Sequence, residues 1–264
     1  MRSSDRMLLI ALTERLRGLD AAMAGLRETQ ERIERRLDAI ETGAGADRKA
    51  AKATARTGYA QVEDLMALYR GIDAAEPLPR MRGFAAGPEL MRFLYEEVVS
   101  RGGAQVLECG SGTTTVVLAY VMRSLRAGHV TALEHDPHYA ARTRRELETR
   151  GLTAWAAVVD APLTDVDLGG EVWRWYEPTA IPHAEIELLL VDGPPGGTGP
   201  QARYPALPVL ADRLAKDVLV VLDDADRPDE RAIASRWAAE FAEFEQERLD
   251  FDRGTTVLRR ATGR

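Results

Sequence analysis

The fold of this chain is decided by one stretch, Val106-Leu107-Glu108-Cys109-Gly110-Ser111-Gly112-Thr113-Thr114-Thr115. The apolar run over residues 104–109 predicts a short buried strand, and residues 114–126 follow a helical pattern. Gly110 and Gly112 allow the backbone between these elements to turn tightly and to approach a ligand closely. The stretch therefore predicts a strand, a ligand-binding loop and a helix in direct succession.

Strands and helices alternate along the chain after this stretch. Further strands are predicted over residues 130–134, 154–159, 186–191 and 218–222, with helices between or after them over residues 139–150 and 228–243. Such alternation is typical of a parallel sheet that is covered by helices on both faces. Residues 244–251 and 255–259 flank Asp252-Arg253-Gly254, which predicts a closing antiparallel hairpin.

Acidic residues follow all five predicted parallel strands, and they are Glu108, Glu134, Asp160, Asp192 and the pair Asp223-Asp224. Ligands of open parallel sheets bind beyond the carboxyl ends of the strands. One acid at a strand end is usually a helix cap or a solvated turn residue, but five in succession indicate a site.

The glycine loop does not match the common phosphate-binding patterns. A phosphate loop would end in Gly-Lys-Ser/Thr, which is absent, and a dinucleotide fingerprint would have a third glycine or an alanine where Thr115 stands. Glu108 would repel a pyrophosphate. It suits a cationic ligand such as the sulfonium and amino group of S-adenosylmethionine.

These residues resemble a class I S-adenosylmethionine-dependent methyltransferase over roughly residues 80–260. The resemblance implies an α/β fold with a Rossmann-like seven-stranded sheet and an antiparallel last strand. It also implies that Gly110, Ser111 and Gly112 pass under the methionine part of the cofactor, near Glu108. Glu134 would bind the ribose hydroxyls, and the residues expected beside the adenine or elsewhere along the cofactor are His135, Asp160, Ala161, Thr113 and Asp192.

A narrower resemblance comes from Met81–Ala86, Leu133–Pro137, Trp175-Tyr176, Val191–Gly196, Ala202–Leu207 and Leu222–Arg227. Together these segments are similar to a bacterial, mainly actinobacterial group of class I methyltransferases with an N-terminal coiled coil. This group indicates the fold and the cofactor better than the acceptor.

Three acids are candidates for metal binding, namely Asp192, Asp223 and Asp224. Carboxylate oxygens are ligands that Mg²⁺ prefers, and metal-dependent O-methyltransferases similarly place acids after these two strands, although the catechol group usually has Asn where Asp224 stands. The alternative is that these acids cap helices or bind Arg203 and Arg227. Asp192 and His183 are the candidate catalytic residues, with His183 as a general base in a loop.

The loop over residues 193–205 is rich in Gly and Pro, and Arg203 and Tyr204 are candidate contacts to the methyl acceptor. The alternative is that this pair anchors the loop. Trp173, Trp175 and Tyr176 form either a wall over the cofactor or acceptor, or part of a core strand.

The N-terminal segment follows a heptad pattern through Leu9, Leu12, Leu16, Leu19, Met23, Leu26, Gln30, Ile33, Leu37 and Ile40. This narrow seam predicts a coiled coil that joins subunits into a homo-oligomer, and a polar residue such as Gln30 at an a position is a known register device. The alternative is one long helix packed on its own domain. We therefore expect a coiled-coil helix over residues 1–45, a helical linker over 46–80 and a methyltransferase domain over 81–264.

Composition limits the classes of partner. The 264 residues have a net charge of −7, and residues 1–56 contribute +3, so the remainder carries −10. That charge argues against a nucleic-acid partner, whose phosphates would be repelled. The single cysteine, Cys109, suits a reducing compartment, and the sequence has no long apolar run that would predict a membrane span. We therefore expect a cytoplasmic protein.

The leading hypothesis is methylation of an oxygen atom of a small molecule, such as a sugar or a secondary metabolite, with S-adenosylmethionine as donor and Mg²⁺ assistance left open. One alternative is an NAD-dependent oxidoreductase, but Glu108 and Thr115 do not match the dinucleotide-binding pattern that it would need. Another is a coiled-coil scaffold whose domain binds a nucleotide without turnover. The sequence does not identify the acceptor, because one fold serves many acceptors.

Overall fold

A computed structural model describes residues 15–16, 18–20, 22–33, 45–72, 74, 76–81 and 85–260. The chain divides into two compact units, Met1–Ala60 and Gln61–Arg264. The elements are α2 (Gly45–Gly71), α3 (Pro88–Arg101), β1 (Gln105–Cys109), α4 (Thr113–Leu125), β2 (His129–Glu134), α5 (Pro137–Thr149), β3 (Ala156–Asp160), β4 (Leu163–Leu168), β5 (Glu171–Tyr176), β6 (Ile186–Val191), α6 (Ala206–Leu210), β7 (Leu214–Leu222), α7 (Pro228–Glu240), β8 (Phe244–Leu249) and β9 (Thr255–Arg260).

The first unit is helical wherever it is described. Residues 15–16, 18–20 and 22–33 are all in helical conformation, and the heptad side chains described there, Leu16, Leu19, Met23, Leu26 and Ile33, are between 37% and 57% exposed. The other apolar heptad positions, Leu9, Leu12, Leu37 and Ile40, lie outside the described residues. α2 begins at Gly45 and ends at Gly71, within the range predicted for a helical linker over residues 46–80 but for its first residue.

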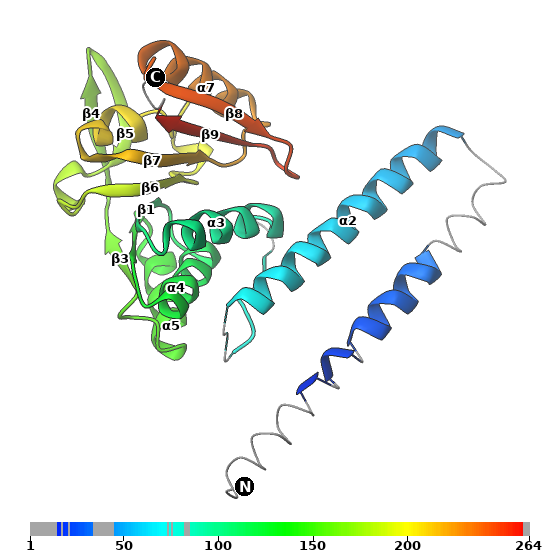
Figure 1. The fold of residues 1–264 in the computed structure, drawn as a ribbon. Coiled ribbons are helices and arrows are strands. Elements are labelled where there is room, and N and C mark those ends of the chain that lie inside the picture. The colour runs from blue at the N-terminus through cyan, green and yellow to red at the C-terminus, as the bar shows by residue number, and fades with distance from the viewer. Residues whose placement is uncertain are drawn as a thin grey trace, which may run out of the picture. The chain divides into compact units, whose positions relative to one another are not determined.

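The second unit contains a seven-stranded sheet in the order β3-β2-β1-β6-β7-β9-β8 (Figure 1). The first five strands of this order are parallel, and β9 runs antiparallel to both β7 and β8. The predicted seven-stranded sheet with an antiparallel last strand is confirmed. Because the strand order reverses between β1 and β6, their carboxyl ends flank the crevice where open sheets bind ligands.

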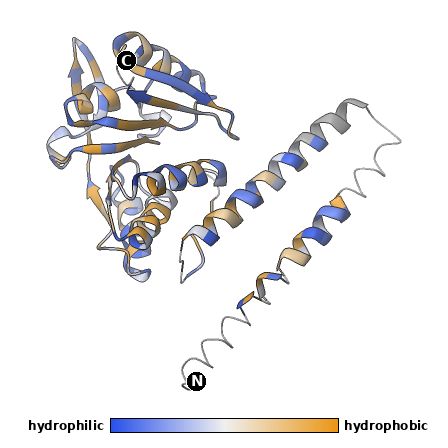
Figure 2. Ribbon diagram, in the orientation of Figure 1, coloured by the Kyte–Doolittle hydropathy of each residue, from blue (hydrophilic) through white to orange (hydrophobic). Residues whose placement is uncertain are grey.

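Hydrophobic cores lie on the two faces of the sheet. One contains Leu94 of α3, Val117 of α4 and Leu147 of α5. The other contains Trp175 and Tyr176 of β5 together with Trp237 of α7. Figure 2 shows hydrophobic residues concentrated in the strands and in α4, as expected for strands that are buried on both faces.

An additional hairpin stands apart from the main sheet. β4 and β5 pair antiparallel around the turn at Gly169 and Gly170, and this pairing is absent from the predicted elements. The hairpin resolves the two alternatives for the aromatic residues: Trp175 and Tyr176 are fully buried in the core, and Trp173 packs against it.

Among the helices that the structure describes, none combines the length and apolar character needed to cross a membrane.

Candidate functional site

The glycine loop, residues 110–112, connects β1 to α4. It lies at the centre of the edge of the sheet where the parallel strands end, which we call the carboxyl edge. Gly110 has φ +105°, a conformation that side-chain-bearing residues rarely adopt, and its N–H donates to the Leu133 carbonyl at 2.9 Å. The N–H of Gly112 donates to Thr115 Oγ1 at 3.0 Å, and this hydroxyl in turn donates to Glu108 Oε2 at 2.6 Å. Thr115, the residue that argued against a dinucleotide fingerprint, therefore fixes both the loop and the acid beneath it.

Glu108 is a buried carboxyl group that lines the site. Its side chain is 2% exposed, and the Thr115 hydroxyl is neutral, so no cation among these contacts compensates its charge. Burial raises the pKa of Glu108 to about 8, with further contributions from the neighbouring Asp192 and Glu134 carboxylates, while the Thr115 hydrogen bond opposes the rise. A cationic ligand would stabilise the charged form of this acid.

Glu134, at the end of β2, links the glycine loop to α5. Ser111 Oγ donates to Glu134 Oε2 at 2.9 Å and lies 3.2 Å from Thr143 Oγ1. The Asp136 N–H donates to Glu134 Oε1 at 3.0 Å, and Nδ1 of the neighbouring His135 is 3.1 Å from the same oxygen. These contacts hold the carboxylate in place through mainly neutral donors.

The acid after β3 differs from these two. Asp160 has a side chain that is 68% exposed and pairs with Arg144 Nη2 at 2.8 Å. Ala161 is fully buried, and its N–H donates to the Glu134 carbonyl at 2.8 Å. Asp160 and Ala161 lie beside Glu134, and all three lie outside the pocket lining, as do Gly110 and His135. The contacts predicted between these five residues and the cofactor stay predictions.

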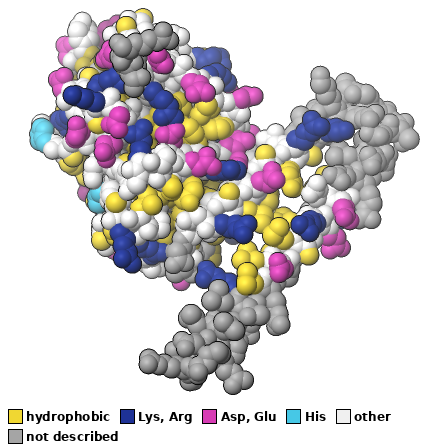
Figure 3. Space-filling model, in the orientation of Figure 1, with side chains coloured by type: hydrophobic (Ala, Val, Ile, Leu, Met, Phe, Trp, Pro, Cys, Tyr) yellow, Lys and Arg dark blue, Asp and Glu magenta, His cyan; other side chains and the backbone are white. Residues whose placement is uncertain are grey.

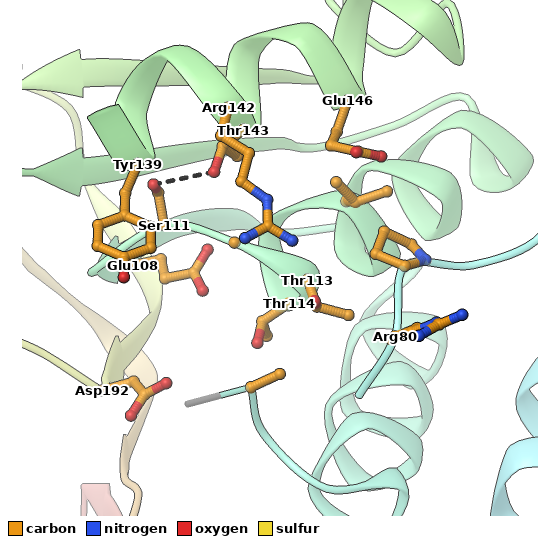
Figure 4. A pocket seen from close by; sticks show the side chains of 14 residues that line it. Arg80, Glu108, Ser111, Thr113, Thr114, Tyr139, Arg142, Thr143, Glu146 and Asp192 are labelled. Carbon is orange, nitrogen blue, oxygen red and sulfur yellow. Dashed lines mark hydrogen bonds between the residues drawn. The ribbon is translucent and has the colours of Figure 1, made fainter. Parts of the chain in front are cut away.

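A pocket of about 240 Å³ opens over the loop (Figure 4). Five residues predicted for the cofactor line it: Glu108, Ser111, Gly112, Thr113 and Asp192. The lining also includes Pro79, Arg80, Ala85, Thr114, Val116, Tyr139, Arg142, Thr143 and Glu146, which sequence reasoning did not select. The four on α5 occupy positions i, i+3, i+4 and i+7, starting from Tyr139, and so share one helix face. This spacing is a signal that could have found them, whereas Arg80 offers no such signal.

Two of these added residues bring positive charge to the pocket. Arg142 extends from α5 towards the glycine loop, whereas Arg80 lies at the far side of the pocket with its side chain directed away from Glu108 and Asp192 (Figure 4). The pocket lining thus combines the guanidinium of Arg142 with the carboxyl groups of Glu108 and Asp192, a combination that suits a zwitterionic ligand such as an amino acid.

The second acidic cluster lies at the carboxyl ends of β6 and β7. One carboxylate oxygen from each of Asp192, Asp223 and Asp224 lies within 4.8 Å of the other two, so the structure brings the three predicted metal ligands together. Asp192 alone of the three also lines the pocket.

A buried arginine is bound within this cluster. Arg203, 3% exposed, places Nη2 at 3.2 Å from Asp192 Oδ1 and at 3.0 Å from Asp224 Oδ2, while Nη1 donates to the Asp223 carbonyl at 3.0 Å. Its Nη1 is also 3.7 Å from Glu230 Oε1 on α7. Burial raises the pKa of Asp192 to about 7; Arg203 opposes the rise, and the other two aspartates add to it.

Two further arginines, the exposed Arg227 and the partly buried Arg253, complete the compensation of charge in this cluster. Arg227 Nη1 lies 2.9 Å from Asp224 Oδ2, and Arg253 Nη1 lies 3.5 Å from Asp224 Oδ1. These contacts agree with the second interpretation of the three aspartates, in which they bind arginines and not a metal.

Tyr204 makes the contacts of a loop anchor. Its hydroxyl donates to Glu240 Oε2 at 2.6 Å, its carbonyl accepts from Trp237 Nε1 at 3.0 Å, and the Arg236 guanidinium stacks 3.8 Å above its ring. Neither Tyr204 nor Arg203 lines the pocket, and His183 is exposed in the segment before β6, also outside the lining. The catalytic and acceptor-binding roles predicted for these residues stay predictions.

Comparison with known proteins agrees with this geometry. Residues 107–225 match the family model described as a methyltransferase domain. Among solved structures, the SAH-bound methyltransferase PaMTH1 of Podospora anserina is 14% identical and aligns over 83% of this chain and 98% of its own, with a TM-score of 0.57. An O-methyltransferase from Bacillus cereus in complex with SAH is 15% identical over 76% of this chain and 90% of its own, with a TM-score of 0.50. No curated protein matches the sequence. At these identities the structural likeness shows the fold.

Proposed function

We propose that this protein, whose residues 107–225 match the methyltransferase-domain model and whose sheet has the class I order, transfers the methyl group of S-adenosylmethionine to an oxygen atom of a small molecule. The observation that carries the proposal is Glu108, a buried carboxylate in the wall of a pocket over the glycine loop, held by a neutral hydroxyl. A sulfonium or ammonium group is the ligand charge that this environment favours, because it compensates the buried negative charge.

The predicted cofactor contacts support one orientation of the donor. Glu108 and Asp192 would face the methionine amino and sulfonium groups, whereas Arg142 and the N-terminus of α4 suit the carboxylate. Glu134 would accept hydrogen bonds from the ribose hydroxyls, with His135 and Asp160 towards the adenine. These roles form part of the proposal.

The chemical step is a displacement at the sulfonium methyl group. The acceptor oxygen forms a bond to the methyl carbon as the carbon–sulfur bond breaks and the electron pair stays on sulfur. The acceptor's hydroxyl proton must leave, and Asp192, which lines the pocket and has a raised pKa, is the base that we assign. His183 is the second candidate base; an acceptor that reaches it would have to extend beyond the pocket.

A small acceptor suits the charge of the domain better than a nucleic acid does. The remainder of the chain after residue 56 carries −10, and acidic and basic side chains intermingle on the face drawn in Figure 3. The O-methyltransferase likeness at a TM-score of 0.50 is compatible with an oxygen acceptor. We therefore propose a sugar or a secondary metabolite as the acceptor class. We also propose a cytoplasmic location, because the single cysteine, Cys109, suits a reducing compartment.

The ion pairs that Asp192 and Asp224 form with Arg203 do not fit a divalent metal at this cluster. Arg203 already donates to two of the three carboxylates that a metal would need. Asp223 Oδ2 has no hydrogen-bond partner among the described residues, but one oxygen beside a guanidinium is a poor start for Mg²⁺, which needs near-octahedral oxygen coordination. No step of the proposed reaction passes through a metal.

We also propose that the N-terminal helix joins subunits, because its described heptad side chains are exposed within one chain. Leu19→Asp combined with Leu26→Asp in the full chain should lower the mass measured by light scattering, since two charges would enter the apolar seam. Glu28→Arg with Arg32→Glu, which exchanges charges at heptad positions on the outer face of the helix, should not lower it. An unchanged mass for the leucine variant would contradict the proposed coiled coil.

The proposed function is tested by calorimetry and by transfer of label. S-adenosylmethionine and S-adenosylhomocysteine should bind to the full chain while NAD should not, and labelled methyl groups should enter a hydroxyl-bearing compound from a metabolite pool. Binding of NAD without binding of S-adenosylmethionine would favour the oxidoreductase alternative. Donor binding without any transfer would favour the scaffold alternative.

A further inference from the structure

The side chain of Arg203 lies where a metal ion would have to bind. The three oxygens contributed by Asp192, Asp223 and Asp224 lie within 4.8 Å of one another, a spacing compatible with one shared cation. The Arg203 guanidinium contacts two of these side chains at 3.0–3.2 Å and the backbone carbonyl of the third at 3.0 Å.

The position of Arg203 results from tertiary contacts on several elements. Its partners come from the end of β6, the end of β7 and, through Glu230, the first turn of α7. With 3% exposure, the guanidinium cannot leave the cluster for solvent without reorganising the segment that leads into α6. Its neighbour Tyr204 anchors the same segment through Glu240 and Trp237.

The charges within the cluster also argue against a bound metal ion. Three carboxylates lie within 4 Å of the Arg203 guanidinium, those of Asp192, Asp224 and Glu230, and the nearby Asp223 carboxylate also acts on its charge. Arg227 and Arg253 bind Asp224 in addition. A divalent ion within this cluster would lie next to a buried positive charge and would have to displace it, because a buried guanidinium remains charged.

We propose that Arg203 serves as a built-in cation in place of a metal: it neutralises the carboxylates after β6 and β7 and positions Asp192 at the pocket, so that methyl transfer is independent of metal. This inference deepens the proposed function and rests on it only for the catalytic part. Arg203 is a positioning residue, because it acts through Asp192 and does not line the pocket.

The first test is Mn²⁺ binding to the full chain, followed by electron paramagnetic resonance, which needs no activity. Wild type and Asp192→Asn should bind Mn²⁺ equally, because any weak binding would come from surface acids elsewhere. A single Mn²⁺ bound by wild type and lost in Asp192→Asn would overturn the proposal. A lack of turnover in both proteins would count against the proposed function and leave this result intact.

The second test removes the guanidinium. Arg203→Met should gain a Mn²⁺ signal that the double variant Arg203→Met/Asp192→Asn loses. Arg227→Ala is the matched control, because it deletes an arginine from the same Asp224 oxygen but leaves Arg203 in place; it should gain none. Equal gains in Arg203→Met and Arg227→Ala would contradict a specific role for Arg203. If Arg203→Met does not fold, the wild-type measurement still decides the proposal.

The third test separates positioning from general support of the fold. Wild-type turnover should be unchanged in excess EDTA, and Arg203→Lys, which retains a positive charge, should recover part of kcat lost in Arg203→Met at similar KM for the donor. Loss of turnover in EDTA that Mg²⁺ restores would overturn the proposal, and so would a lysine variant no more active than the methionine variant.

Discussion

Glu108 and Asp224 are both buried carboxylates at the ends of parallel strands, but the groups around them differ. Glu108 accepts from the neutral hydroxyl of Thr115. Asp224 is bound by three arginines, of which Arg203 is buried. A buried charge with only neutral donors is left for a cationic ligand to compensate, whereas one paired with arginine is already compensated. The two halves of the carboxyl edge therefore serve different purposes: one for the ligand, the other for the fold.

The largest expected effect follows from removing the buried guanidinium of Arg203. Arg203→Met should lower the free energy of unfolding by about 3–5 kcal/mol, because several buried carboxylates lose their partner. Arg227→Ala removes a half-exposed partner of the same Asp224 oxygen and should cost less than about 1 kcal/mol. Chemical denaturation of both variants measures the difference, and equal losses would contradict a buried role specific to Arg203.

The next largest effect concerns Glu108, which lies in the half of the carboxyl edge that we assign to the ligand. Glu108→Gln should weaken binding of S-adenosylmethionine by about 2 kcal/mol, or roughly thirtyfold, because the cationic donor loses its buried counter-charge. S-adenosylhomocysteine lacks the sulfonium charge and should lose less affinity. Glu245→Gln, an exposed change on β8, is the control in calorimetry. Unaltered donor affinity in Glu108→Gln would remove Glu108 from the site.

The pH dependence of donor binding follows from the raised pKa of Glu108. Because burial raises that pKa to about 8, protonation of Glu108 competes with a cationic ligand below this pH, and the ligand displaces the proton on binding. Affinity should therefore rise with pH up to about 8 and fall by up to roughly tenfold per unit below it. Calorimetry across pH 6–9 should show a proton release that Glu108→Gln abolishes. An identical pH profile in that variant would assign the titration to another group.

The smallest effect concerns the link between the loop and β2. Ser111→Ala removes the hydroxyl that donates to Glu134 Oε2 and should weaken donor binding about fivefold, or about 1 kcal/mol. Thr164→Ala, a loss of a hydroxyl on the separate hairpin strand β4, is the matched control and should leave the affinity unchanged. Similar losses in the two variants would show that the Ser111–Glu134 contact is not the cause.

Local pattern predicted most of the sheet. The apolar run over residues 186–191 became β6 with the expected bounds, and the hairpin of β8 and β9 follows the turn at Gly254. The hairpin β4–β5 was missed although Gly169 and Gly170 mark a turn. Its aromatic residues were assigned either to a wall of the site or to a core strand, without the partner strand over residues 163–168. The sequence also predicted that strand-end acids gather, since parallel strands share one carboxyl edge.

The contacts that distinguish the two halves of this edge depend on tertiary structure. Arg203 was recognised as a residue of interest, but its insertion between Asp192 and Asp224 depends on how the loop before α6 folds over β6 and β7. Arg80 joins the pocket wall from a segment before α3. Neither placement is encoded in a local repeat or in a spacing, so pattern reasoning could only leave alternatives open.

The most direct test of the central claim is a calorimetric titration of the full chain in EDTA with S-adenosylmethionine, set beside the same titration of Glu108→Gln. The account predicts that wild type binds the donor without any divalent metal and that the variant binds it roughly thirtyfold more weakly. Binding that requires Mg²⁺, or equal affinity in the two proteins, would contradict it.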